Sequence, residues 1–226
     1  MLHSTYKHKS TNEDPKTSAI FENLILLPDN IIWFILRQSC FSNSTMPIYS
    51  GKLLSYDFWP HWNRAGTINS NFVEPDLFLE FELFDVIIEA KYGDRAGQNI
   101  PQWQKEIKAY QNEFYDKERE SQKPFVFIAV GGNQSVEMET VSKTNIYKCN
   151  WLSILIEVYK YQKEVELLTI PDMNISATRR LLDNIILAFN INGVYNIEWF
   201  NSLTNSISTI SDSSIDLICS LFKEKI

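Results

Sequence analysis

The sequence contains few of the residues that bind transition metals or build disulfide frameworks. Its three cysteines, Cys40, Cys149 and Cys219, are far apart and form no Cys-x-x-Cys pair. We therefore expect neither a disulfide framework nor a zinc knuckle, and a reducing, cytoplasmic setting is the simplest one. With only three histidines, the chain is also a poor source of a histidine-based zinc site.

Long apolar runs and an excess of positive charge are missing too. No apolar run reaches the roughly 18 residues that span a membrane, so no membrane partner is expected. There are 21 Lys and Arg residues against 28 Asp and Glu, and the formal net charge is −7. A surface that binds polyanions everywhere is therefore not expected. A nucleic-acid role would need positive charge in one cleft, or a cation that bridges acidic groups to phosphate.

What the chain does contain is enough apolar residues for a full-sized domain. Of its 226 residues, 44% are hydrophobic and 13% aromatic, which favours a compact fold. The polar segment 1–18 is predicted to be a flexible lead-in, residues 19–165 the core, and residues 166–226 a helical C-terminal extension packed on that core. Across residues 20–130 the patterns predict the order helix, strand, strand, strand, helix, strand.

The most informative residues follow an apolar run, Val86 to Ile88, which is typical of a buried central strand. Glu89 and Lys91 come directly after it, two residues apart, and so project from the same face of the strand. A carboxylate and an ammonium group in such a place are costly unless they pair or bind something.

A second carboxylate, that of Asp76, opens the preceding strand. A hairpin centred near residue 83 would place Asp76 opposite residues 89–91. Two carboxylates can hold Mg²⁺, which lowers the pKa of a bound water and neutralises charge that develops on a phosphate. A lysine beside the metal can orient or deprotonate that water. The set therefore favours phosphodiester hydrolysis.

These residues resemble a known signature. Pro75-Asp76, followed after twelve residues by Glu89-Ala90-Lys91, is similar to the motif of the PD-(D/E)xK, or restriction-endonuclease-like, nuclease superfamily. The helix that begins near Pro101 carries Gln102, which resembles the family's further motif. The resemblance covers residues 20–130 and implies an α/β fold: an α-β-β-β-α-β core with a mixed central sheet flanked by helices, to which the chain adds a mainly helical C-terminal extension.

The resemblance also implies roles for individual residues. Asp76, Glu89 and the backbone carbonyl of Ala90 would bind Mg²⁺, with Mn²⁺ as a substitute, and Lys91 would be the catalytic lysine. Gln102 would support the site, with Gln104 and Gln98 as alternatives. Many relatives add an acidic residue from the first helix, for which Glu22 is the candidate. Position 106 is Glu rather than the Tyr of exonuclease-type members.

The function implied is a metal-dependent deoxyribonuclease, cytoplasmic, of a defence or restriction type, with DNA as partner and a homodimer as one arrangement. An alternative is a catalytically inactive nucleic-acid-binding or complex-forming module on the same fold. A third hypothesis, an accidental motif, predicts that Asp76 and Lys91 lie far apart. Among other features, the Trp59–Arg64 segment is interpreted as a packed turn rather than a base contact, and Gly131-Gly132 as serving backbone geometry. Lys105 and Lys108 are phosphate contacts or scattered surface cations.

Overall fold

The computed structural model describes residues 13–67, 71–93, 97–115, 122–168 and 173–196. Of these, the residues up to 194 belong to one compact unit. Within the described ranges helices and strands follow one another in the order α2 Glu13–Leu24, α3 Asp29–Ser39, β1 Leu53–Phe58, β2 Leu77–Phe81, β3 Asp85–Ala90, α4 Ile100–Phe114, β4 Phe125–Val130, β5 Glu139–Val141, β6 Thr144–Cys149, α5 Trp151–Leu167 and α6 Met173–Ile191.

The strands form one mixed, open sheet in the order β1-β2-β3-β4-β6-β5. Strands β1, β2 and β3 pair antiparallel, as the predicted hairpin requires, with Leu77 opposite Ile88. Strand β4 is parallel to β3 because the chain returns through α4, and β6 is parallel to β4. The predicted α/β class is confirmed, as is the order of elements from α3 to β4.

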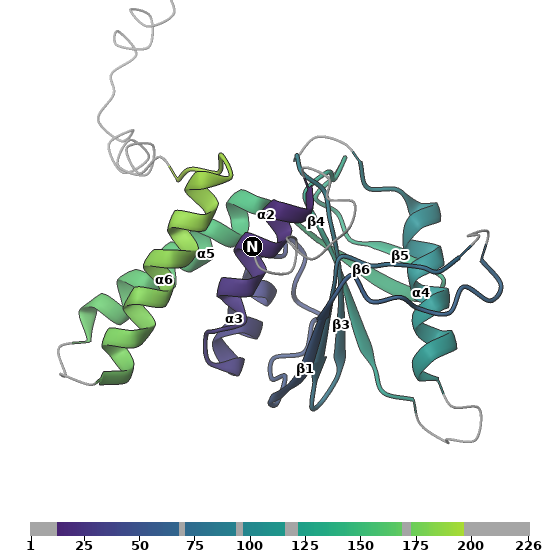
Figure 1. Ribbon diagram of the computed structural model, residues 1–226, viewed down its shortest axis with the longest axis horizontal. Coiled ribbons are helices and arrows are strands. Elements are labelled where there is room, and N and C mark those ends of the chain that lie inside the picture. Colours follow the sequence, from purple (N-terminus) through teal and green to yellow (C-terminus); the bar gives the residue numbers. More distant parts are fainter. Residues whose placement is uncertain (1–12, 68–70, 94–96, 116–121, 169–172, 197–226) are drawn as a thin grey trace, which may run out of the picture. The chain divides into compact units, whose positions relative to one another are not determined.

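Helices cover both faces of this sheet (Figure 1). Alternate side chains of β2 and β3 point to opposite faces, so Leu77, Leu79 and Ile88 pack with α2, α3, α5 and α6 in one apolar cluster. Phe78 and Ile87 pack with α4 in the other cluster. In α4 the apolar face includes Trp103, Ile107 and Tyr110, all buried.

The structure differs from the predicted elements at three places. Helix α2 begins at Glu13, so part of the predicted lead-in is helical, and Lys16, Thr17 and Ser18 are buried there. The polar side chains of this segment suggested that it is exposed to solvent. Ala19 and Ile20 of the same helix, however, pack in the apolar core. A short strand, β5, was not predicted, and the helix that the apolar spacing of α4 predicts over residues 101–119 ends at Phe114. Of the extension, α6 packs on α2 and α5, and residues 197–226 lie outside the described part.

Candidate active site

Asp76 lies where the sequence placed it, beside the end of β3. Because Leu77 pairs with Ile88, Asp76 lies beside the last two residues of β3, Glu89 and Ala90. The backbone N–H of Ala90 donates to Asp76 Oδ2 at 2.8 Å. Asp76 Oδ1 accepts from the indole Nε1 of Trp59 at 3.2 Å, and the Trp59 backbone N–H donates to the Asp76 carbonyl at the same distance. The carboxylate is 9% exposed and is fixed by two donors.

Glu89 and Lys91 lie on the sheet face that α4 covers, since Ile87, two residues before Glu89, belongs to the α4 cluster. The Lys91 ammonium donates to Glu89 Oε1. The side chain of Gln102, from the first turn of α4, donates to the same oxygen at 2.6 Å. Glu89 is 1% exposed. The structure therefore brings Asp76, Glu89, Lys91 and Gln102 together. The hypothesis of an accidental motif predicts instead that Asp76 and Lys91 lie far apart.

Gln98, one of the two alternatives to Gln102, contacts the backbone of the same residue. Its Nε2 donates to the Glu89 carbonyl at 2.9 Å, and its Oε1 accepts from Trp103 Nε1 at 2.8 Å. The other alternative, Gln104, is exposed on α4. Gln102 and Gln98 thus divide the support of Glu89 between its carboxylate and its main chain.

Glu106 is a site residue that the sequence interpretation missed. It lies one helical turn after Gln102, is 1% exposed, and its carboxyl group is in hydrogen-bond contact with that of Glu89. Burial raises the pKa of Glu106 to about 8, and the nearby charge of Asp76 adds to the effect. Burial and the charge of Glu106 raise the pKa of Glu89 well above its ordinary value, against the opposing effect of Lys91. Two such carboxyl groups favour a proton or a cation between them.

The backbone after β3 is held by three different elements. The Lys91 carbonyl accepts from Trp151 Nε1 at 2.7 Å, and the Tyr92 carbonyl accepts from Lys16 Nζ at 2.9 Å. The Gly93 carbonyl accepts from the backbone N–H of Gly132 at 2.6 Å. These contacts fix the main chain of the lysine, so its ammonium moves only by side-chain rotation.

The glycines after β4 make this arrangement possible. Gly131 has φ +67°, and a Cβ there would lie 2.7 Å from the Lys91 carbonyl oxygen and 2.8 Å from that of Gly93. Their predicted role in backbone geometry is confirmed. The predicted packed turn at Trp59–Arg64 is also found, because Trp59 and Trp62 are buried.

Glu22, the proposed first-helix carboxylate, lies on α2, on the opposite face of the sheet from α4. Its carboxylate accepts a hydrogen bond from Ser18, four residues earlier on the same helix. The residue of α2 that reaches the segment after β3 is instead Lys16, which lies over the Trp151 ring at 4.7 Å from its centroid.

The oxygen atoms at this place suit a hard cation. In an extended strand the N–H and C=O of one residue point to the same edge, so the Ala90 carbonyl faces the edge on which its N–H contacts Asp76. Glu106 Oε2 is buried and has no hydrogen-bond partner. Among the described residues, no group of three or more His, Cys, Asp or Glu side chains is arranged to hold a metal ion. Two carboxylates and a carbonyl fit Mg²⁺, which keeps several waters.

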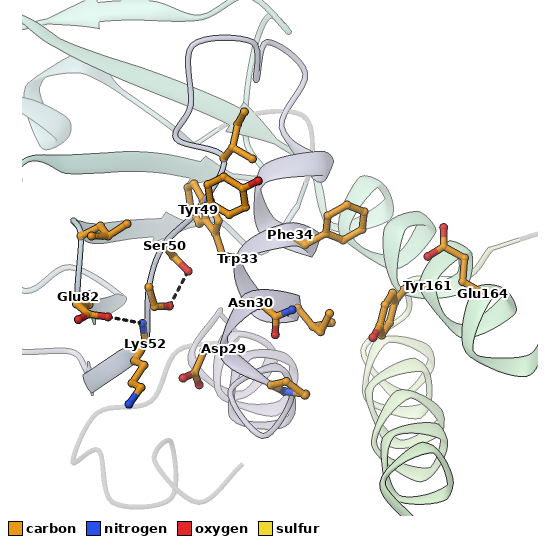
Figure 2. Close-up of a pocket in the computed structure, with 15 residues that line it drawn as sticks. Asp29, Asn30, Trp33, Phe34, Tyr49, Ser50, Lys52, Glu82, Tyr161 and Glu164 are labelled. Atoms are coloured by element: carbon orange, nitrogen blue, oxygen red, sulfur yellow. Dashed lines mark hydrogen bonds between the residues drawn. The ribbon is translucent and has the colours of Figure 1, made fainter. Parts of the chain in front are cut away.

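A small polar cleft of about 190 Å³ opens beside these residues, lined by Val73, Glu74, Asn99, Gln102, Lys105 and Glu106. A larger cavity of about 1040 Å³ lies at the opposite end of the sheet, by the β2–β3 turn. Figure 2 shows its aromatic side chains, among them Trp33, Phe34 and Tyr161. The larger cavity contains none of the predicted site residues, whereas Gln102 lines the polar cleft.

Comparison of the chain with protein-family models, curated proteins and solved structures gives no match. Among the helices in the described part of the chain, none is long and apolar enough to cross a membrane.

Proposed function

We propose that the protein is a Mg²⁺-dependent nuclease that hydrolyses phosphodiester bonds in DNA, on a restriction-endonuclease-like core. One observation carries the proposal: Asp76, just before β2, and Glu89, near the end of the neighbouring strand β3, lie beside a partly buried lysine, Lys91, that is paired with Glu89. The PD-(D/E)xK signature and the α-β-β-β-α-β order of elements support it.

The carboxylates of Asp76 and Glu89 and the carbonyl of Ala90 would hold the ion. Bound there, Mg²⁺ supplies charge neutralisation at the phosphate and lowers the pKa of a coordinated water. Without a cation, the carboxylates of Asp76, Glu89 and Glu106 would repel a phosphate. The proposal therefore accounts for an acidic protein with a polyanionic substrate.

Lys91 has the role of orienting the attacking water or a phosphate oxygen through its ammonium group. Its side chain is 14% exposed and its main chain is held by Trp151, so the ammonium is pre-positioned for a hydrogen bond to the substrate. Gln102 keeps Glu89 in place by donating to its carboxylate.

The test is cleavage of supercoiled and linear DNA by the full-length chain with Mg²⁺, Mn²⁺ or EDTA. We expect cleavage with either metal, none with EDTA, and a loss of about 100-fold or more in Lys91→Ala. Lys160→Ala is the control, because Lys160 is an exposed lysine on α5 whose side chain pairs with Glu157. Unchanged cleavage by Lys91→Ala would refute the assignment. DNA binding without cleavage or metal binding would support the inactive module instead.

A further inference from the structure

Two lysines on α4 stand out from the other cations near the site. Lys91 and Lys148 are each paired with a glutamate, and Lys16 with a backbone carbonyl. Lys105 and Lys108, among the residues that the structure describes, form no ion pair. They lie three residues apart, and hence on one side of the helix.

The two lysines line a second hollow, next to the polar cleft. This hollow has a volume of about 210 Å³ and is lined by Gly66, Thr67, Pro101, Gln104, Lys105 and Lys108. Lys105 lines both spaces, so the two hollows lie on either side of this one residue.

A turn, residues 63–67, lines the second hollow opposite α4 and is hydrogen-bonded to that helix. The side chain of Asn112 donates to the carbonyls of Asn63 and Ala65, at 2.9 Å and 2.8 Å. Gly66 approaches Lys108 so closely that a Cβ there would lie 3.3 Å from the lysine Cε. The turn also carries Arg64, which is exposed. The hollow between the two lysines and this turn is therefore bordered by positive charge.

We propose that Lys105 and Lys108, facing the turn of residues 63–67, bind the phosphate backbone of DNA next to the scissile bond. The inference rests on the proposed function. A DNA strand that places one phosphate at the metal has further phosphates on either side of it. Lys105 and Lys108, which form no ion pair within the described part of the chain and lie beside the acidic site, are positioned to contact these neighbouring phosphates. Such contacts carry affinity, not sequence preference, because the backbone is the same for every sequence.

The test measures binding of a fluorescein-labelled DNA duplex and of its single strand by anisotropy, at several KCl concentrations. Both measurements use the full chain carrying Lys91→Ala, with Mg²⁺. We expect Lys105→Glu/Lys108→Glu to raise the Kd at least about tenfold. The slope of log Kd against log salt should fall by about 2 on duplex DNA, since each phosphate contact contributes about 0.9.

The matched control is Lys160→Glu/Lys163→Glu, a pair with the same spacing on α5, on the other side of the sheet. It should change the Kd less than twofold. The neutral variant Lys105→Gln/Lys108→Gln, which adds no new charge, should give an intermediate loss. Circular dichroism confirms that each variant is folded.

The outcomes separate this inference from the proposed function. If the wild-type chain cleaves DNA but the charge-reversed pair binds with an unchanged Kd and salt slope, the lysine contacts are refuted and the nuclease proposal stands. If the chain does not cleave DNA, yet its binding still depends on the two lysines, the contacts are supported and the nuclease proposal fails. A loss equal in the α5 control would also refute the inference, because it would reflect net charge alone.

Discussion

The carboxyl of Glu106 should make the metal-free protein less stable as the pH rises. Its pKa is raised from 4.5 to about 8, so between these values the folded chain holds a proton that the unfolded chain releases. The folded state then binds more protons, and the free energy of unfolding falls as the pH rises through this window. The groups that face Glu106 are Glu89 and Lys91 from the β3 end, Asp76 before β2 and Gln102 on α4.

The size of the effect follows from that window. At pH 7 an unshared pKa of about 8 would cost the folded state roughly 3 kcal/mol relative to a neutral group. Because Glu89 is in hydrogen-bond contact with Glu106 and also has a raised pKa, we expect about 1–3 kcal/mol. Glu106→Gln has the same shape and can still donate a hydrogen bond to Glu89. It should therefore stabilise the protein by this amount at pH 7 and by much less at pH 4.5.

Urea unfolding in EDTA, at intervals from pH 4.5 to pH 8, measures the effect. The control is Glu166→Gln, an exposed glutamate on α5, which should change stability by less than about 0.5 kcal/mol at every pH. If Glu106→Gln is less stable than wild type at pH 7, or keeps the wild-type pH dependence, then ionisation of the Glu106 carboxyl does not destabilise the folded state, and the argument is refuted.

Two further predictions concern the supports of the site. Gly131→Ala should destabilise the protein by more than about 2 kcal/mol and lower DNA cleavage, because its Cβ would clash with the Lys91 carbonyl. Gly193→Ala has a similar positive φ but an open surrounding, and should cost only about 1 kcal/mol in urea unfolding; equal losses would show that the clash is relieved. Trp59→Phe removes the indole donor to Asp76 and should cost about 1–2 kcal/mol and weaken Mg²⁺ binding in calorimetry, whereas unchanged binding would show that the Ala90 N–H alone orients the carboxylate.

Local patterns were sufficient for the hairpin and for the meeting of its ends. The apolar run before Glu89 marked the buried strand, and the short turn fixed its partner, so the contact of Asp76 with Ala90 followed from register. Gln102 could be expected at the site because the next helix starts soon after the strand. All of these residues are close in the sequence.

Other parts of the site depend on contacts that local patterns do not encode. Lys16 meets the Tyr92 carbonyl across 76 positions of sequence, and no periodicity of either segment indicates it. Glu106 did carry a signal: it lies three residues after Trp103 and four before Tyr110, inside the buried stripe of α4. A glutamate within an apolar stripe needs a partner, and this one has Glu89.

The carboxylates, the lysine and the glutamines of the site all come from one stretch of chain, from Asp76 to Glu106, whereas Lys16 and Trp151, which hold the main chain after β3, come from far away. Assembling the stretch closes only short loops, which costs little chain entropy. Docking of Lys16 and Trp151 over its end requires much longer loops. We expect the carboxylates to meet, and to lose their water under α4, early in folding, and the main chain after β3 to be fixed only when α2 and α5 dock. Their mutual repulsion should then appear as slower folding of the metal-free chain rather than as faster unfolding.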